Sequence, residues 1–158
     1  MNIKINEKWR EVKENCTVYA LKNEEFPDSH IIVLNGFPLV EDKELKDGDR
    51  IVFIKKGIMP NKEELEELMV SRHTPGIHEK LKSIKVLIAG CGGLGSNIAI
   101  SLGRIGVGSI SLVDFDIVEP SNLNRQQYYI DDIGEFKVTA LKRNLIKINP
   151  FIKIEALN

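Results

Sequence analysis

The sequence predicts an α/β protein in which a small β-grasp domain precedes a partial, doubly wound, Rossmann-like parallel sheet. Short strand-like runs separated by turn residues fill the first 57 residues. Apolar strands alternate with amphipathic helices from residue 84 onward, and a glycine cluster joins the first of these strands to its helix. We therefore expect a β-grasp domain at 1–57, a helical linker at 58–83 and the first part of the parallel-sheet domain at 84–158.

Composition narrows the functional class. Because 22 Lys and Arg face 23 Asp and Glu, the net charge of -1 gives no field that would attract nucleic acid or a membrane. Cys16 and Cys91 form no CxxC pair, so neither a disulfide framework nor a zinc site is indicated. No signal segment is evident and no apolar run approaches the roughly 20 residues that span a bilayer. We expect a soluble cytoplasmic protein in a reducing compartment.

The first domain contains four expected strands and one helix. Turn signals at Asn35-Gly36 and Asp47-Gly48 separate the strands, and Thr17 is the expected N-cap of the helix. The strands are expected at 2–6, 10–12, 30–34 and 50–56. The order strand, strand, helix, strand, strand is typical of a small β-grasp sheet.

The linker is expected to be helical. Asn61 is the expected N-cap of a helix over 61–72, and a second helix is expected to start at Pro75 after the N-cap Thr74. Beyond it, strands are expected at 85–89, 109–113 and 151–157, with helices at 96–104 and 135–147. Apolar strands that alternate with helices predict a parallel sheet covered by helices.

The glycine cluster has the spacing of a nucleotide-binding loop. Gly90, Gly92 and Gly95 fit GxGxxG: the first allows a tight turn, the second lets backbone N–H groups approach phosphate, and the third allows close helix packing. Gly93 adds a fourth glycine. Asp114 ends the next strand, 24 residues after Gly90, where a carboxylate accepts hydrogen bonds from ribose hydroxyls. On these residues alone, NAD is the default ligand.

The loop "DFDIVEPSNLNRQ" at 114–126 favours a different nucleotide. It holds two acids, Asp114 and Asp116, and then Asn122 and Arg125, for which a hydride-transfer site has no evident need. Arg125 can give forked hydrogen bonds to phosphate oxygens, and Lys137 in the following helix can add a point charge. These residues suit a triphosphate whose α- or β-phosphorus reacts.

Three segments, "AGCGGLGSNIA", "DFDIVEPSNLNRQ" and "IGEFK", resemble the ATP-binding half of the ThiF/MoeB/HesA family, relatives of the ubiquitin-activating enzymes. The resemblance runs from about Ser71 to the C-terminus. It implies that ATP activates the C-terminal glycine carboxylate of a small β-grasp carrier as an acyl-adenylate, with release of pyrophosphate. It also implies Mg²⁺, whose acid ligand is expected beyond residue 158.

The same resemblance implies roles for individual residues. Arg125 and Lys137 are the expected catalytic groups, with Arg72 contributed across a homodimer interface to the partner's ATP. Asn122 also addresses the phosphates, and Asp114 holds the ribose. The remaining expected nucleotide-binding residues are Gly90, Gly92, Gly93, Gly95 and Asp116. By contrast, Cys91 is expected to be a small packed side chain rather than a nucleophile.

The first domain resembles ThiS, the sulfur carrier of thiamine biosynthesis, in "VLNGFPL" and "LKDGDRIVFI". A working carrier ends in Gly-Gly, whereas Gly57 is single and lies in mid-chain. We therefore expect this domain to have a docking, regulatory, dimer-building or purely stabilising role, and the adenylated substrate to be a separate ThiS-like carrier. No nucleic acid or membrane partner is expected.

Three alternatives stay open from the sequence. A MoeB- or HesA-like relative would adenylate another carrier, such as that of molybdopterin synthase, or a carboxylate on tRNA. An NAD-dependent oxidoreductase would use the glycine loop and Asp114 equally well. A non-catalytic module would bind nucleotide or carrier without chemistry.

Overall fold

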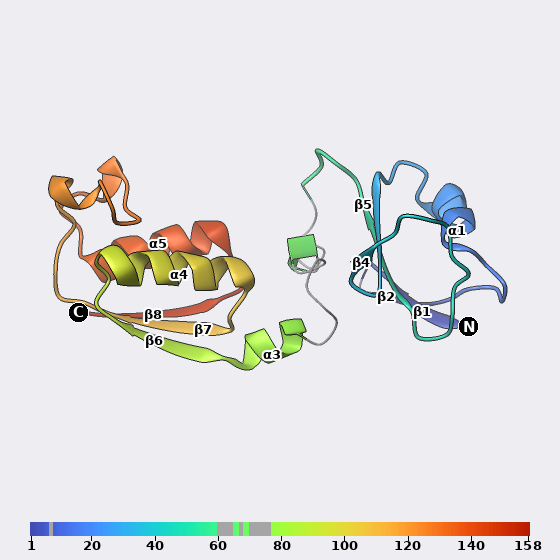
Figure 1. Ribbon diagram of the computed structural model, residues 1–158, viewed down its shortest axis with the longest axis horizontal. Helices are drawn as coiled ribbons and strands as arrows, with labels where there is room; N and C mark the ends of the chain where they lie inside the picture. The colour runs from blue at the N-terminus through green and yellow to red at the C-terminus, as the bar shows by residue number, and fades with distance from the viewer. Residues whose placement is uncertain (7, 60–64, 67, 70–76) are drawn as a thin grey trace. The chain divides into compact units, whose positions relative to one another are not determined.

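The computed structural model describes residues 1–6, 8–59, 65–66, 68–69 and 77–158. The chain divides into two compact units, Met1–Gly76 and Ile77–Asn158, and the division lies within the segment expected to be a linker (Figure 1). Of the helix expected over 61–72, only residues 65–66 and 68–69 are described, and they are helical. Asn61, Thr74 and Pro75, expected at the helix starts, lie outside the described residues.

The first unit contains a five-stranded sheet in the order β2-β1-β5-β3-β4, in which β1 and β5 are parallel and the other pairs antiparallel. Its elements are β1 (Asn2–Ile5), β2 (Lys8–Glu11), α1 (Val18–Glu25), β3 (Ile31–Leu34), β4 (Phe37–Pro38) and β5 (Arg50–Ile54). This arrangement confirms the β-grasp prediction. The two-residue strand β4 was not expected; it follows a turn in which Asn35 and Gly36 both have positive φ.

Helix α1 begins where the sequence predicts. The Thr17 hydroxyl accepts a hydrogen bond of 3.2 Å from the Ala20 N–H, which satisfies one of the free donors at the helix start. Val18 and Leu21 are buried against the sheet, whose core residues are Ile3, Ile5, Ile32, Ile51 and Phe53. The β-grasp unit therefore has a hydrophobic core of its own.

The second unit is a parallel sheet in the order β6-β7-β8. Its elements are α3 (Ile77–Ser83), β6 (Lys85–Ala89), α4 (Gly93–Ile105), β7 (Ser109–Val113), α5 (Lys137–Ile148) and β8 (Lys153–Leu157), with 3-10 turns at Pro120–Asn122 and Ile130–Asp132. Helices α4 and α5 lie on the same face of these strands (Figure 1). This follows from right-handed connections that both step in one direction across the sheet.

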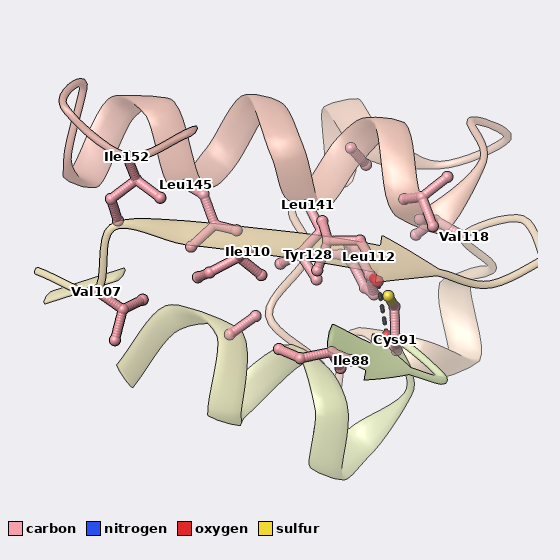
Figure 2. Close-up of a cluster of buried hydrophobic side chains, with 13 residues drawn as sticks. Ile88, Cys91, Val107, Ile110, Leu112, Val118, Tyr128, Leu141, Leu145 and Ile152 are labelled. Carbon is pink, nitrogen blue, oxygen red and sulfur yellow. Dashed lines mark hydrogen bonds between the residues drawn. The ribbon is translucent and has the colours of Figure 1, made fainter. Parts of the chain in front are cut away.

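The core of this unit lies between the sheet and the two helices (Figure 2). Ile110 and Leu112 of β7 and Leu141 and Leu145 of α5 are completely buried. The strands are in register, so that Ala89 pairs with Val113 and Val113 with Leu157. Their carboxyl ends therefore align at one edge, where the loops that follow β6 and β7 meet.

Among the described residues, no helix is both long and apolar enough to cross a membrane.

Candidate functional site

The glycine loop turns sharply at the end of β6 and enters α4 directly. Gly90 has a φ of 91°, which favours glycine, and its N–H donates to the Val113 carbonyl at 2.8 Å. A Cβ on Gly95 would lie 1.8 Å from the Gly90 carbonyl oxygen, so α4 begins in close contact with the loop. Helix α4 starts at Gly93, three residues before the expected start, so Gly95 and its contact with Gly90 lie in the first helical turn.

The backbone at the start of α4 is open to a ligand. Apart from the adjoining residues, no atom of the described part of the chain lies within 4 Å of the position that a Cβ on Gly92 would occupy. No side chain caps this end of the helix, and the first N–H groups of an α-helix have no acceptor within it. These donors and the positive end of the helix dipole suit an anion such as phosphate.

Asp114 braces the glycine loop. Its Oδ2 accepts a hydrogen bond from the Cys91 N–H at 2.6 Å, and its Oδ1 accepts one from the Asp116 N–H at 2.8 Å. Each carboxylate oxygen has a second lone pair, so Asp114 can still accept bonds from further donors. Sequence reasoning did not anticipate this bracing contact.

Lys137 is a buried cation at the first position of α5. It is only 7% exposed, and its Nζ lies 2.8 Å from Asp116 Oδ2. Its backbone N–H also donates to the Asp116 carbonyl at 2.9 Å. A cation is unfavourable at a helix N-terminus and costly to bury, so Asp116 compensates for the position of Lys137.

Arg125 lies against the start of α4. Its Cγ, Cδ and Nε are each 3.8 Å from the position of a Cβ on Gly93. Its Nη1 donates to Asn124 Oδ1 at 2.9 Å and to the Ser121 carbonyl at 3.4 Å. Both partners are neutral, so an anion can replace them without separating an ion pair.

Asn122 shapes the loop that carries Arg125. Its side chain is buried, with Oδ1 accepting from the Glu119 N–H at 3.1 Å and Nδ2 donating to the Ser121 hydroxyl at 3.4 Å. The phosphate contact implied by the resemblance stays a prediction for Asn122. Arg72 lies outside the described residues. The other expected site residues all lie on the glycine loop, on the first turns of α4 or α5, or on the loop after β7.

The sequence profile of the ThiF family matches residues 65–158. The chain belongs to the ThiF family. Residues 1–57 match a second profile, described as ThiS-like ubiquitin. We call Ile77–Asn158 the ThiF unit and the β-grasp domain the ThiS-like unit.

Two relatives illustrate the extent of the similarity. A sulfur carrier protein adenylyltransferase of Thermus thermophilus is 37% identical over 100 residues, which are 60% of this chain and 37% of that protein. A molybdopterin-synthase adenylyltransferase of Haemophilus influenzae is 47% identical over 81 residues, 51% of this chain and 33% of that protein. The chain therefore spans about a third of the length of these relatives.

A crystal structure of Escherichia coli MccB with ATP is also similar. Its sequence is 40% identical, its TM-score is 0.50, and the match covers 51% of this chain and 25% of that chain. The prediction of a Rossmann-like fold is confirmed by this similarity and by the parallel sheet of the ThiF unit.

A hydrogen bond between Tyr128 and Cys91 joins the loop after β7 to the glycine loop of the ThiF unit. The buried Tyr128 hydroxyl donates to the Cys91 carbonyl at 2.7 Å, the dashed line in Figure 2. Burial raises the pKa of Tyr128 well above its usual range, so the phenol stays a donor. Burial, aided by the charge of Asp114, raises the pKa of the Cys91 thiol to about 11. A buried, protonated thiol is unreactive, as expected for a packed side chain.

We expect the native Cys91 thiol to react with iodoacetamide at pH 8 far more slowly than that of Cys16. Cys91 is fully buried, and with a pKa of about 11 only about one thiol in a thousand is ionised at that pH, whereas Cys16 is partly exposed. Timed alkylation followed by peptide mass spectrometry measures both rates. Equal labelling in denaturant is the control. Rapid labelling of Cys91 in the native protein would show an accessible thiolate and would support a role for Cys91 as a nucleophile.

Asp132 fixes the turn before α5 to that helix. It is 1% exposed, and its Oδ2 accepts bonds of 2.8 Å from the Tyr129 N–H and from Asn144 Nδ2, while Oδ1 accepts from Arg143. Burial alone would raise the pKa of Asp132. The hydrogen bonds from Tyr129, Asn144 and Arg143, with the arginine's charge, outweigh burial and lower it below the usual range.

Asp132→Asn should destabilise the ThiF unit by about 1–3 kcal/mol at pH 7, because donors aimed at a carboxylate lose their charge-assisted bonds. Since the pKa of Asp132 is lowered on folding, its stabilisation is complete above the unfolded-state value of about 3.9 and falls as pH drops through the folded-state value. Urea unfolding of both proteins at pH 7 and pH 3 should show the difference shrinking at pH 3. A difference that is the same at both values would contradict this assignment.

Proposed function

We propose that the ThiF unit binds ATP and forms part of an adenylyltransferase that activates the C-terminal glycine carboxylate of a separate ThiS-like sulfur carrier, in the thiazole branch of thiamine biosynthesis. One observation carries the proposal. An open glycine loop, Arg125 against Gly93 and the buried Lys137 lie in the loops and helix starts at one edge of the sheet. Cations beside a helix N-terminus suit a polyphosphate better than a hydride-transfer site.

The proposed chemistry gives each group a role. The phosphates rest on the N-terminus of α4 and Asp114 accepts ribose hydroxyls. The carrier carboxylate attacks the α-phosphorus, the bond to the β-phosphate oxygen breaks, and pyrophosphate leaves. Negative charge accumulates at the phosphates during this step, and Arg125 and Lys137 stabilise it. Mg²⁺, which the family resemblance implies, would neutralise part of the charge on the triphosphate. The described residues include no group of three His, Cys, Asp or Glu that could hold a metal.

The ThiS-like unit is not the substrate in this proposal. Gly57, where the carrier tail would end, has a φ of 77° and is followed by Ile58. In the proposal this unit has a docking, regulatory, dimer-building or purely stabilising role. The proposal also includes a homodimer in which Arg72 reaches the partner's ATP. The name of the Thermus relative, sulfur carrier protein adenylyltransferase, supports a carrier as the substrate.

A second candidate function is adenylation of the carrier subunit of molybdopterin synthase. The name of the Haemophilus relative favours it, and the residues around the glycine loop suit both reactions equally. The choice of carrier therefore depends on contacts with the carrier itself.

Exchange of labelled pyrophosphate into ATP tests these proposals. We expect exchange with a ThiS-type carrier and none with the same carrier lacking its terminal glycine, which is the matched control. Exchange only with a molybdopterin-synthase carrier would favour the second candidate. Tight NAD binding without ATP binding would favour an oxidoreductase, and binding without exchange with any carrier would favour a non-catalytic module.

A further inference from the structure

Asn97 connects helix α4 to the loop that carries Arg125. Its Nδ2 donates to the Arg125 carbonyl at 3.1 Å and to the Gly93 carbonyl at 2.5 Å. Its Oδ1 accepts from Gln127 Nε2 at 2.7 Å. Both amide hydrogens and the amide oxygen are therefore used, and two of the three bonds end on the Arg125 loop.

Two neighbouring bonds run between the same segments. The Gln127 N–H donates to the hydroxyl of the buried Ser96 at 3.1 Å, and Tyr128 binds the Cys91 carbonyl. Residues 125–128 are thus tied to residues 91–97 at several points. Of these bonds between the two segments, the one from Asn97 ends on the backbone of Arg125. Within its own loop, the Arg125 N–H donates to the Asn122 carbonyl at 3.2 Å.

The side chain of Arg125 has no comparable support. It lies near the open side of Gly93, and among the interactions of the described residues it bonds only to Asn124 and Ser121 of its own loop. The direction in which the guanidinium leaves the loop therefore depends on how the Arg125 backbone is held. A displacement of about 1 Å at such a group is enough to weaken catalysis strongly.

We propose that Asn97 is a positioning residue for Arg125, and that it sets the site's affinity for the nucleotide phosphates through that arginine. This inference rests on the proposed function in taking the bound anion to be a phosphate of ATP. Asn97 itself touches the loop and the helix rather than the ligand.

Asn97→Ala should weaken ATP binding about 3- to 10-fold, because it removes the hydrogen bond to the Arg125 carbonyl, worth about 1 kcal/mol. Ser101→Ala is the matched control. Ser101 lies one turn further along α4, is exposed, and bonds to the Asn97 carbonyl at 2.9 Å. It should bind ATP as the wild type does. Isothermal titration of the 158-residue chain with ATP gives each dissociation constant.

A double-mutant cycle separates positioning from general structural loss. If Asn97 acts through Arg125, Asn97→Ala should have no further effect on ATP affinity once Arg125 is alanine. An equal loss in both backgrounds would mean that Asn97 supports the site independently of Arg125, and would overturn the inference.

Trypsin provides a test without nucleotide. Asn97→Ala should speed hydrolysis of the bond after Arg125 by about 3- to 10-fold, because the loop opens more often, with cleavage after Arg143 in α5 as the internal reference. If Asn97→Ala speeds this cleavage but the chain binds no ATP, the inference that Asn97 holds the Arg125 backbone stands and the proposed function is contradicted. Unchanged cleavage at Arg125 would overturn the inference whatever the affinity for ATP.

Discussion

Arg125→Ala is expected to lower the rate of carrier-dependent ATP–pyrophosphate exchange by about 100-fold or more. In the proposed reaction, negative charge grows at phosphates that are already charged. In that proposal the Arg125 guanidinium, whose Nε lies 3.8 Å from the position of a Cβ on Gly93, donates to those oxygens. Loss of one such donor in an active site typically costs two to three powers of ten in rate.

The measurement is steady-state exchange with saturating carrier and varied ATP. Arg104→Ala is the matched control, because it removes the same charge from an exposed position in the last turn of α4. Lys137→Met should give a loss similar to that of Arg125→Ala. An Arg125→Ala protein that exchanges at the wild-type rate would remove this arginine from the mechanism.

Gly95→Ala is expected to destabilise the ThiF unit by about 3 kcal/mol, the upper end for overpacking. The added Cβ would lie 1.8 Å from the Gly90 carbonyl oxygen and 3.2 Å from Ile88 Cγ2. Since the nearest atom belongs to the backbone, no side-chain rotation relieves the clash. Helix α4 must shift away from β6, or the glycine loop must open.

Gly92→Ala is the matched variant, three positions earlier in the same glycine loop. Gly92 has a φ of -76°, and apart from its chain neighbours no described atom lies within 4 Å of its Cβ position. As the N-cap of α4 it should lose only about 1 kcal/mol on substitution by alanine, clearly less than Gly95→Ala. ATP affinity should still fall, because the methyl group occupies the approach to the backbone N–H groups. Urea unfolding followed through amide signals of β6 and β7 compares the two variants. Equal stability of Gly95→Ala and wild type would contradict the close contact.

The central elements of the ThiF unit were predictable because local pattern and tertiary structure agree. The strands at 85–89 and 109–113 match the structure, since apolar runs bounded by glycine or polar residues also lie in the buried sheet. The start of α4 was misplaced because glycine is a poor helix former. In the structure the helix begins at Gly93, and its first turn packs closely on Gly90, a contact that local propensity does not reveal. Similarly, α5 begins at Lys137 rather than at residue 135.

The candidate site was only partly predictable. Residue type and spacing indicated the glycine loop and the charged groups after β7, because strand ends of a parallel sheet gather at one edge. They did not indicate that Asp114 binds the Cys91 N–H or that Asn97 binds the Arg125 carbonyl. These partners are 23 and 28 residues apart in sequence. The sequence hinted at the Asn97 contact only by placing a polar residue among the apolar residues of "LGSNIAI".

Because Lys137 is held in an ion pair with Asp116, the entropy cost of ordering its side chain arises when the chain folds and not when a ligand binds. Immobilising a lysine side chain costs up to about 2 kcal/mol in lost rotamer freedom. Here the ammonium is already held at 2.8 Å in the folded chain, so this cost belongs to folding. An anion that reaches this edge of the sheet therefore meets a lysine side chain that is already ordered. Its binding is not weakened by the entropy cost of ordering that side chain.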